Sequence, residues 1–462
     1  KQKAKRIIMG NIVRKSSFII SVPTKSSDNH YIFVHGYTGG ADILNANLAE
    51  AINSNKINGL EKKEIDFLLD RGYLTTKTKE EELTYVSNLV EKIYKYYQKQ
   101  LTVLIAPNLD CSFRCTYCFQ RELQNKITKK PDISLAKIMD KNQVDKIYDV
   151  LDDKAKDINC KLNKEITLYG GEALQESNIE IINYIVSEGV KRDFIFSAIS
   201  NGYEIDKFYN LFGENGLKKV QLTLDGFEDM HDKMRVEKNG NSSFYKIVEN
   251  IDNGLNKGCV FDIAFNFDEK NVNNISSLIN FFNKKEWLNN PNIIIHGNQI
   301  FDLKTNLTAF QENYDEILEL RKLAKKHNIM LSNSTTKIRE LFKSRLDKDL
   351  PLPLKPSYCS ANTGMYIFAP DNHLYACWEA VGESISKVGT YYPKYELDNK
   401  MMDKWKSRVA SRIDECHQCE YIMFCGGGCT INAYRKNGEF LSPYCDSFEK
   451  KFSDLMNSIV EI

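Results

Sequence analysis

A strand–loop–helix pattern that repeats from about residue 101 to residue 300 constrains the fold of this chain most strongly. Six short apolar runs predict strands: LTVLIAP, EITLYGG, FIFSAISNG, KVQLTLDG, FDIAFNF and NIIIHGN. Amphipathic segments between them, such as residues 142–153, 179–189 and 244–255, have helical spacing. Alternating strands and helices are typical of a parallel sheet. Six units predict an α/β fold, a partial (β/α)6 TIM-like barrel.

The residues with distinctive chemistry follow the predicted strands. Cys111 comes after the first strand, Gly170 to Glu172 after the second, Ser200 and Asn201 after the third, and Asp225 after the fourth. In such folds the chemistry lies at the carboxyl ends of the strands. We therefore expect these motifs to form one site.

Three cysteines, Cys111, Cys115 and Cys118, lie within the eight residues CSFRCTYC. A closed tetrahedral zinc site needs four ligands, and disulfides need an even number. Three thiolates on one loop therefore indicate a metal centre with one open position; a zinc knuckle or a chance cluster is the alternative. The chain has 12 cysteines, and in a reducing compartment metal or redox use is favoured over disulfides. We assign no function to Cys160 and Cys259.

The C-x3-C-x2-C loop resembles that of the radical S-adenosylmethionine (SAM) enzymes. The resemblance implies a [4Fe–4S] cluster whose open iron binds SAM, which is cleaved reductively to methionine and a 5′-deoxyadenosyl radical. It also implies SAM contacts: Gly170, Gly171 and Glu172 at the amino group, Ser200 and Asn201 at the ribose and methionine, Arg235 at the carboxylate, and Tyr117 against the adenine. Asp225 and His231 belong to TLDGFEDMHDKMR, which resembles one subgroup's "LDG…HD..R" segment. The resemblance implies a direct role for Asp225 and His231, with Asp225 among the cofactor contacts. A helix cap or loop hydrogen bond is an equally weighted alternative for both residues.

A second cysteine array occupies the C-terminal part of the chain. It resembles the SPASM extension, which implies two auxiliary [4Fe–4S] clusters, three clusters in all. The outer cluster would be held by Cys416, Cys419, Cys425 and Cys445, and the inner by Cys359, Cys377 and Cys429. Seven cysteines leave the inner cluster with an open iron, a non-cysteine ligand or a bound peptide thiol. One or two zinc sites are the alternative. Asn372 replaces a family glycine, and we expect it to keep the left-handed turn.

The predicted domains are residues 1–100, 101–300, 301–350 and 351–462. The first combines strands in SFIISVP and YIFVHGY with helices in residues 38–54, 60–74 and 80–100, which predicts a winged-helix-like module. It resembles a leader-recognition domain, which implies that a leader peptide adds as a strand to SFIISVP or YIFVHGY. A simple packing domain is the alternative. Residues 301–350 are expected to form bridging helices before the cysteine-rich SPASM domain.

These resemblances imply an enzyme that matures a ribosomally synthesised peptide with a thioether or C–C cross-link. The expected partners are a precursor peptide with a leader segment and a reductant such as flavodoxin or ferredoxin. A sulfatase maturase is a rival function, but Trp378 follows Cys377 where that branch has an aspartate base. Strand alternation is expected to turn Glu379 the other way. A small-molecule radical SAM oxidoreductase and a zinc-stabilised non-enzymatic binding protein are two further rivals.

Composition bounds the remaining possibilities. The 462 residues are 42% hydrophobic and 27% charged, and 63 basic against 62 acidic residues give a net charge of +1. Nucleic-acid binding is not expected, because it needs a basic excess. No apolar run reaches the roughly 18 residues of a membrane helix. The basic start of the chain is not followed by a signal-peptide core, so we expect a cytoplasmic protein.

Overall fold

The structure is a computed structural model. It describes residues 7–8, 11–24, 30–129, 137–214, 216–268, 270–300 and 335–460, with residues 320, 322–324, 326–327 and 329–331 between the last two ranges. The chain folds into two compact units. One comprises residues 100–336 and 365–402, and the other comprises residues 1–99, 337–364 and 403–462. Residues 301–319 of the predicted bridging segment 301–350 lie outside the described residues.

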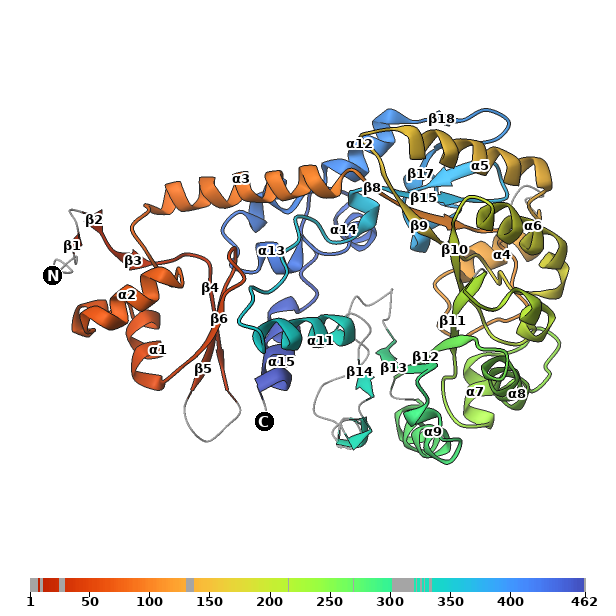
Figure 1. Ribbon diagram of the computed structural model, residues 1–462, viewed down its shortest axis with the longest axis horizontal. Coiled ribbons are helices and arrows are strands. Elements are labelled where there is room, and N and C mark those ends of the chain that lie inside the picture. Colours follow the sequence, from red (N-terminus) through yellow and green to blue (C-terminus); the bar gives the residue numbers. More distant parts are fainter. Residues whose placement is uncertain are drawn as a thin grey trace. The chain divides into compact units, whose positions relative to one another are not determined.

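A mostly parallel sheet is the centre of the unit formed by residues 100–336 and 365–402 (Figure 1). Its strand order is β14-β13-β12-β11-β10-β9-β8-β15-β16-β17-β18. The strands from β14 to β15 pair in parallel, and β16, β17 and β18 continue the sheet in antiparallel pairs. The bounds are β8 (Gln100–Ile105), β9 (Lys161–Leu168), β10 (Ile195–Ile199), β11 (Leu217–Thr223), β12 (Val260–Phe267), β13 (Ile293–Gln299), β14 (Met330–Leu331), β15 (Met365–Phe368), β16 (His373–Tyr375), β17 (Lys387–Thr390) and β18 (Glu396–Leu397).

Helices connect the parallel strands as the sequence predicts. They are α4 (Arg121–Lys129), α5 (Lys141–Lys156), α6 (Ile179–Val190), α7 (Asp229–Met234), α8 (Phe244–Leu255) and α9 (Val272–Lys284). Helix α5 begins at Asp140, whose side chain accepts a hydrogen bond from the backbone N–H of Gln143 in a capping box. The apolar faces of α5, α6 and α8 pack against neighbouring helices and strands. The six predicted strands are confirmed as β8 to β13, and the unit has the predicted α/β fold.

The unit formed by residues 1–99, 337–364 and 403–462 contains small sheets and helices. Its strands are β1 (Ile7–Ile8), β2 (Asn11–Ile12), β3 (Arg14–Lys15), β4 (Ile19–Pro23), β5 (Tyr31–His35), β6 (Ala41–Leu44) and β7 (Leu74–Thr75). Its helices are α1 (Ala46–Asn53), α2 (Lys62–Asp70), α3 (Lys79–Tyr97), α13 (Ile422–Cys425), α14 (Thr430–Asn437) and α15 (Phe448–Val460). Two further helices, α11 (Thr335–Leu346) and α12 (Asn399–Ser407), contain points where the chain passes from one unit to the other.

Two features of this unit differ in detail from the prediction. The segment 38–54 is not one helix: residues 41–44 form β6, and α1 begins after Asn45, which caps it. The three-stranded antiparallel sheet has the order β4-β5-β6, so β5 is its middle strand. The YIFVHGY segment therefore cannot accept an additional strand, because both of its edges are already paired. The winged-helix comparison stays a prediction.

A buried cluster joins α3 to the cysteine-rich segment of the same unit. Val86, Val90 and Tyr94 of α3 pack with residues such as Val409 and Ile422. The Tyr94 hydroxyl also lies 2.9 and 2.7 Å from the carbonyl oxygens of Asn362 and Lys406, which share its single proton. Apolar burial and these hydrogen bonds thus stabilise the contact between α3 and the C-terminal cysteines.

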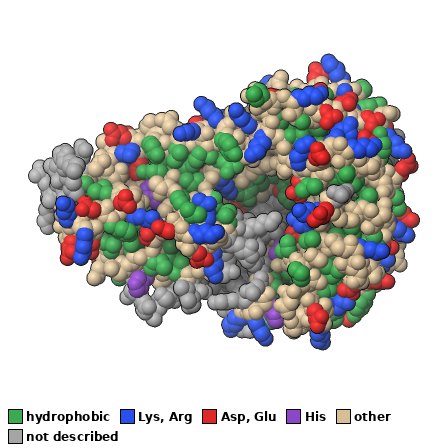
Figure 2. All heavy atoms as spheres, viewed as in Figure 1, with side chains coloured by type: hydrophobic (Ala, Val, Ile, Leu, Met, Phe, Trp, Pro, Cys, Tyr) green, Lys and Arg blue, Asp and Glu red, His purple; other side chains and the backbone are tan. Residues whose placement is uncertain are grey.

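The surface is charged but mixed in sign. On the face shown in Figure 2, lysine and arginine side chains are interspersed with aspartate and glutamate. This distribution agrees with the near-zero net charge and gives no basic stripe on that face. Among the described residues, no helix combines the length and the apolar character needed to cross a bilayer.

Candidate cluster and cofactor site

The three-cysteine loop directly follows β8 and is fixed by backbone contacts. The N–H of Arg114 donates to the carbonyl of Val236 at 2.7 Å, and that of Thr116 donates to Met234 at 2.9 Å. The loop therefore pairs with the segment that contains Arg235. Inside the loop, the N–H of Phe113 lies 3.3 Å from the sulfur of Cys111. These hydrogen bonds fix the backbone of the loop.

The three cysteines are partly buried, and their charges influence one another. Burial raises the pKa of Cys115 to about 11, the charge of Arg235 opposes this rise, and Cys118 adds to it. Burial likewise raises the pKa of Cys111, with further contributions from Glu172, Cys115 and Cys118. Within the described part of the chain, no three His, Cys, Asp or Glu side chains meet at a single-ion position. A cubane differs from a single ion, because its thiolates each bind a different iron.

The Gly-Gly-Glu segment after β9 packs against the backbone that leads into this loop. A Cβ atom on Gly170 would lie 2.3 Å from the carbonyl oxygen of Asn108, and one on Gly171 would lie 2.1 Å from that of Asp110. The N–H of Glu172 donates to the Asp110 carbonyl at 2.9 Å. Only glycine permits this approach, so both glycines are needed to place the cysteine loop.

Glu172 brings the motifs of three strands together. Its carboxylate is buried and accepts hydrogen bonds from the Ser200 hydroxyl at 2.8 Å, the Asn201 N–H at 2.5 Å and the Leu174 N–H at 2.9 Å. Burial raises the pKa of Glu172, and these hydrogen bonds act in the opposite direction. The Asn201 amide in turn donates to the Ser112 hydroxyl at 3.1 Å. The predicted grouping of the strand-end motifs is therefore observed.

A second network surrounds Asp225 after β11. Its buried carboxylate accepts hydrogen bonds from the hydroxyl of Tyr117 and from the backbone N–H of Asn266 at 2.7 Å. Arg235 donates to the Tyr117 hydroxyl at 2.8 Å and lies 3.6 Å from the Asp225 carboxylate. Arg235 and Asp225, both of the predicted SAM set, are thus held in one buried ion pair.

His231 lies beside this network, where it hydrogen-bonds the backbone and makes an edge contact with the Phe244 ring. Its Nδ1 accepts a hydrogen bond from the backbone N–H of Asp225 at 3.2 Å. Burial lowers the pKa of His231 to about 3, and the Arg235 charge lowers it further, so the ring is neutral. His231 and Asp225 therefore make loop hydrogen bonds, which is one of the two roles predicted for these residues.

Several residues of these networks were not predicted from the sequence. Asn266 donates through its amide to Tyr117 and Asp225, and Ser112 accepts from Asn201. A polar residue at the carboxyl end of the apolar strand FDIAFNF is a signal that could have identified Asn266. Ser112 gives no such signal, because a serine is ordinary in a loop.

The segment after Cys377 approaches the Gly-Gly-Glu strand. Residues 378–380 form a short 3-10 helix, so the strand alternation expected to turn Glu379 away does not apply. Burial raises the pKa of Tyr169 well above its usual range, and the charges of Cys118, Cys377 and Glu379 raise it further. The charge of Glu379 therefore acts on the Tyr169 hydroxyl. Trp378 is half exposed and makes edge contacts with Phe119 and Tyr169.

Six of the seven cysteines of the second array lie in the unit that contains residues 403–462, and Cys377 lies in the other unit. Burial raises the pKa of Cys416 to about 12, and Cys419, Cys425 and Cys445 add to this rise. The charges of these predicted outer ligands therefore act on Cys416, and their sharing of one cluster stays a prediction. Asn372, which replaces the family glycine, has a φ of +71° and confirms the expected left-handed turn.

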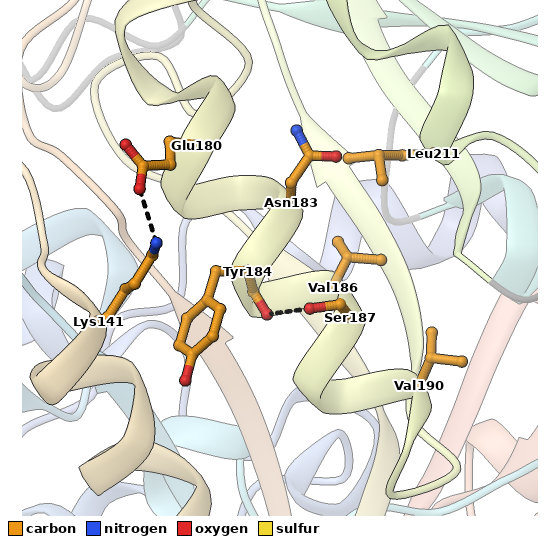
Figure 3. Close-up of a pocket in the computed structure, with 8 residues that line it drawn as sticks. All are labelled: Lys141, Glu180, Asn183, Tyr184, Val186, Ser187, Val190 and Leu211. Atoms are coloured by element: carbon orange, nitrogen blue, oxygen red, sulfur yellow. Dashed lines mark hydrogen bonds and ion pairs between the residues drawn. The ribbon is translucent and has the colours of Figure 1, made fainter.

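A separate surface hollow lies on the outer helices. It is lined by Lys141, Glu180, Asn183, Tyr184, Val186, Ser187, Val190 and Leu211, and Figure 3 shows the Lys141–Glu180 ion pair across it. It contains no thiol and lies along α6 rather than at the strand ends. We therefore place the candidate site at the cysteine loop.

Comparison with known proteins agrees with this geometry. The profile described as Radical SAM superfamily matches residues 106–282. The cysteine-type anaerobic sulfatase-maturating enzyme of Clostridium novyi (strain NT) is 23% identical over 398 residues, or 79% of this chain and 97% of that protein. The solved structure of native anSMEcpe with bound AdoMet has a TM-score of 0.54 at 16% identity and covers 78% of this chain and 99% of that one. The same protein with AdoMet and the Cp18Cys peptide gives a TM-score of 0.53, also at 16% identity, covering 79% and 100%.

Proposed function

The chain is a radical SAM enzyme with a cysteine-rich C-terminal extension, and we propose that it oxidatively cross-links a ribosomally made peptide. The observation that carries this proposal is the grouping of three thiols with Glu172 and Arg235 at the carboxyl ends of adjacent parallel strands. Such a site can bind a cluster with an open iron and a charged cofactor beside it.

The residues present fit the expected cofactors. Cys111, Cys115 and Cys118 would hold the first [4Fe–4S] cluster, because three thiolates leave one iron free. The cysteines of the C-terminal array would hold two auxiliary clusters, with Cys416, Cys419, Cys425 and Cys445 on the outer one and Cys359, Cys377 and Cys429 on the inner one. When bound, the first cluster and SAM supply a 5′-deoxyadenosyl radical that takes a hydrogen atom from the substrate.

The two charged residues have hydrogen-bonding capacity left for SAM. The Glu172 carboxylate offers about four acceptor sites and uses three of them, which leaves one for an ammonium group. Among the described residues, the buried Nε of Arg235 has no acceptor and can donate to a carboxylate. Gly170 and Gly171 hold Glu172 beside the cysteine loop, and Ser200 and Asn201 fix its orientation.

A peptide substrate is supported by the relatives. One is named as a sulfatase-maturating enzyme, and a solved structure of similar fold contains a peptide. Forming a thioether or C–C cross-link removes two hydrogens: one as an atom and the second as a proton and an electron. We assign the electron to the auxiliary clusters, and a flavodoxin or ferredoxin is the proposed source of the electron that starts each cycle.

For leader binding we propose the outer strand β6 of the small sheet. β5 is paired on both sides, and β4 ends in Pro23, which has no N–H and whose carbonyl already accepts from Asn457 at 3.2 Å. Among the described strands, β6 pairs with none except β5, and its Ile43 is exposed. An extended leader peptide can therefore add as a fourth strand. Ile43→Pro should weaken binding of a fluorescent leader peptide, whereas Ile43→Thr should not.

The main test uses the anaerobically reconstituted enzyme. It is incubated with SAM, dithionite and the peptide encoded beside its gene, and products are followed by mass spectrometry. We expect 5′-deoxyadenosine and a peptide lighter by about two hydrogens. Release of 5′-deoxyadenosine with an unchanged peptide would contradict cross-linking.

Formylglycine formation on a sulfatase is the second candidate function. The sulfatase-maturase relative aligns over 97% of its length, and Glu379, two residues after Cys377, supplies a carboxylate whose charge acts on Tyr169. The same incubation with a cysteine-containing sulfatase peptide separates the two functions. An aldehyde at that cysteine, abolished by Glu379→Gln, supports the second candidate; an unmodified peptide excludes it.

A further inference from the structure

Arg408 is a fully buried arginine in the cysteine-rich segment. It directly follows α12, and its side chain is among the largest that are completely enclosed. Burying a guanidinium is costly unless its charge and its N–H groups are matched. Among the described residues, Arg408 forms no ion pair with a carboxylate, so groups other than carboxylates must compensate its charge.

Four of its five N–H groups hold the backbone around the cysteines. Nη2 donates to the carbonyls of Gly427 and Gly428, at 2.6 and 3.3 Å. Nη1 donates to the carbonyls of Phe440 and Ser442, the latter at 2.6 Å. Arg408 thus ties the turn between Cys425 and Cys429 to the segment that precedes Cys445.

The glycine turn is shaped to present these carbonyls. Gly427 and Gly428 have φ values of +84° and +75°, and a Cβ on Gly428 would lie 1.8 Å from the Tyr444 carbonyl oxygen. The N–H of Tyr444 donates back to the Gly427 carbonyl at 3.1 Å. The turn and the segment before Cys445 are therefore one rigid assembly with Arg408 at its centre.

The fifth N–H, on Nε, is buried and has no acceptor among the described residues. The charged groups that act on Arg408 are cysteine sulfurs: burial lowers its pKa, and Cys416, Cys429, Cys425 and Cys359 raise it. A buried donor without an acceptor, on a side chain that ties together the backbone around these cysteines, indicates a missing sulfur acceptor, since an unpaired buried donor is destabilising.

We propose that Arg408 is a positioning residue for the auxiliary clusters, which donates its Nε–H to a cluster sulfur and supplies the positive charge that raises their reduction potential. This inference rests on the proposed function, because it needs iron–sulfur clusters at the C-terminal cysteines. A positive charge and an N–H donor both stabilise the extra electron of a reduced cluster. Arg408 therefore favours acceptance of the electron left after peptide oxidation.

A spectroscopic test uses the full chain with Cys111, Cys115 and Cys118 changed to alanine, so that only auxiliary clusters are loaded. The protein is labelled with guanidino-15N arginine and reduced with dithionite, and pulsed electron paramagnetic resonance detects nitrogen near the clusters. We expect a weak 15N coupling that is absent in Arg408→Lys. Clusters that form without this coupling would overturn the inference. Failure to bind iron at these cysteines would overturn the proposed function instead.

Redox titration of the same proteins tests the charge. Arg408→Gln should move the auxiliary potentials to more negative values. Lys355→Met should do the same without breaking the loops, because Lys355 acts on Cys425 and Cys359 but does not hydrogen-bond the glycine turn. Arg412→Gln is the matched control, since Arg412 is paired with Glu91 at 2.7 Å and should leave the potentials unchanged. Unchanged potentials in both Arg408→Gln and Lys355→Met would refute the charge effect.

Discussion

The hydroxyl of Tyr169 donates a hydrogen bond to the backbone carbonyl of Trp378, 2.7 Å away. The same hydroxyl accepts a hydrogen bond from the Gln120 amide at 2.6 Å. Tyr169 directly precedes Gly170, Gln120 follows the cysteine loop, and Trp378 follows Cys377. One buried phenol therefore fixes the segment after Cys377 against the site at the strand ends.

Replacing Tyr169 with phenylalanine should lower both stability and turnover. The change leaves the Trp378 carbonyl and the Gln120 amide unpaired, which costs about 1–3 kcal/mol in unfolding free energy. Because Trp378 adjoins a proposed ligand of the inner cluster, we expect peptide modification to fall more than 5′-deoxyadenosine release. Thermal unfolding and product analysis under anaerobic conditions measure the two effects.

Tyr148→Phe is the matched control for that variant. Tyr148 is also buried, and its hydroxyl donates to the Ile185 carbonyl at 2.5 Å, but it lies between α5 and α6, away from the cysteines. It should lose similar stability while keeping the ratio of modified peptide to 5′-deoxyadenosine. Equal ratios in both variants would show that the Tyr169 hydroxyl has only a general stabilising role.

The sequence predicted the parallel sheet well because its strands are apolar runs separated by amphipathic helices. It also identified the strand-end motifs, since parallel strands bring their carboxyl ends to one edge. The prediction of a single helix over residues 38–54 was wrong. A four-residue strand and an eight-residue helix follow one another there, and both are too short for their apolar residues to show which periodicity applies. The bonds between Tyr117, Asp225 and Asn266 connect distant segments, which local patterns do not encode.

Gly171→Ala should prevent loading of the first cluster. The new Cβ would lie 2.1 Å from the Asp110 carbonyl oxygen, so the backbone leading to Cys111 must move. If three cubanes are present, we expect a loss of about one third of the iron, together with loss of SAM cleavage.

Gly59→Ala supplies the control for that steric argument, because a Cβ at Gly59 meets no atom within 4 Å. It should retain the full iron content and full SAM cleavage. A Gly171→Ala protein with normal iron and normal SAM cleavage would mean that the loop tolerates the displacement.

Glu172→Gln should weaken SAM binding. The variant keeps the size of the side chain but loses the charge proposed to pair with the ammonium group, a charge-assisted bond of about 1.5–3 kcal/mol, which corresponds to roughly a 10- to 150-fold loss of affinity. Equilibrium binding of SAM to the reconstituted enzyme measures it.

Ser200→Ala removes the hydrogen bond that a neutral hydroxyl donates to the Glu172 carboxylate, and it leaves the charge of that carboxylate unchanged. It should weaken SAM binding much less than Glu172→Gln does. If the two variants lose the same affinity, the Glu172 charge is not the group that SAM contacts.

Acidification should destabilise the protein through His35. Its ring is buried, and burial lowers its pKa to about 4, although Glu82 and the Gly72 backbone act to raise it. An unfolded histidine has a pKa of about 6.5, so between these two values the unfolded state binds more protons than the folded state. The stabilisation is therefore fully present above pH 6.5 and is lost as the pH falls toward 4. Between pH 7 and pH 5.5 this single group should account for about 1 kcal/mol of unfolding free energy. His35→Gln should show a correspondingly flatter pH dependence of the thermal midpoint; a pH dependence as steep as that of the unchanged protein would assign the acid sensitivity to other groups.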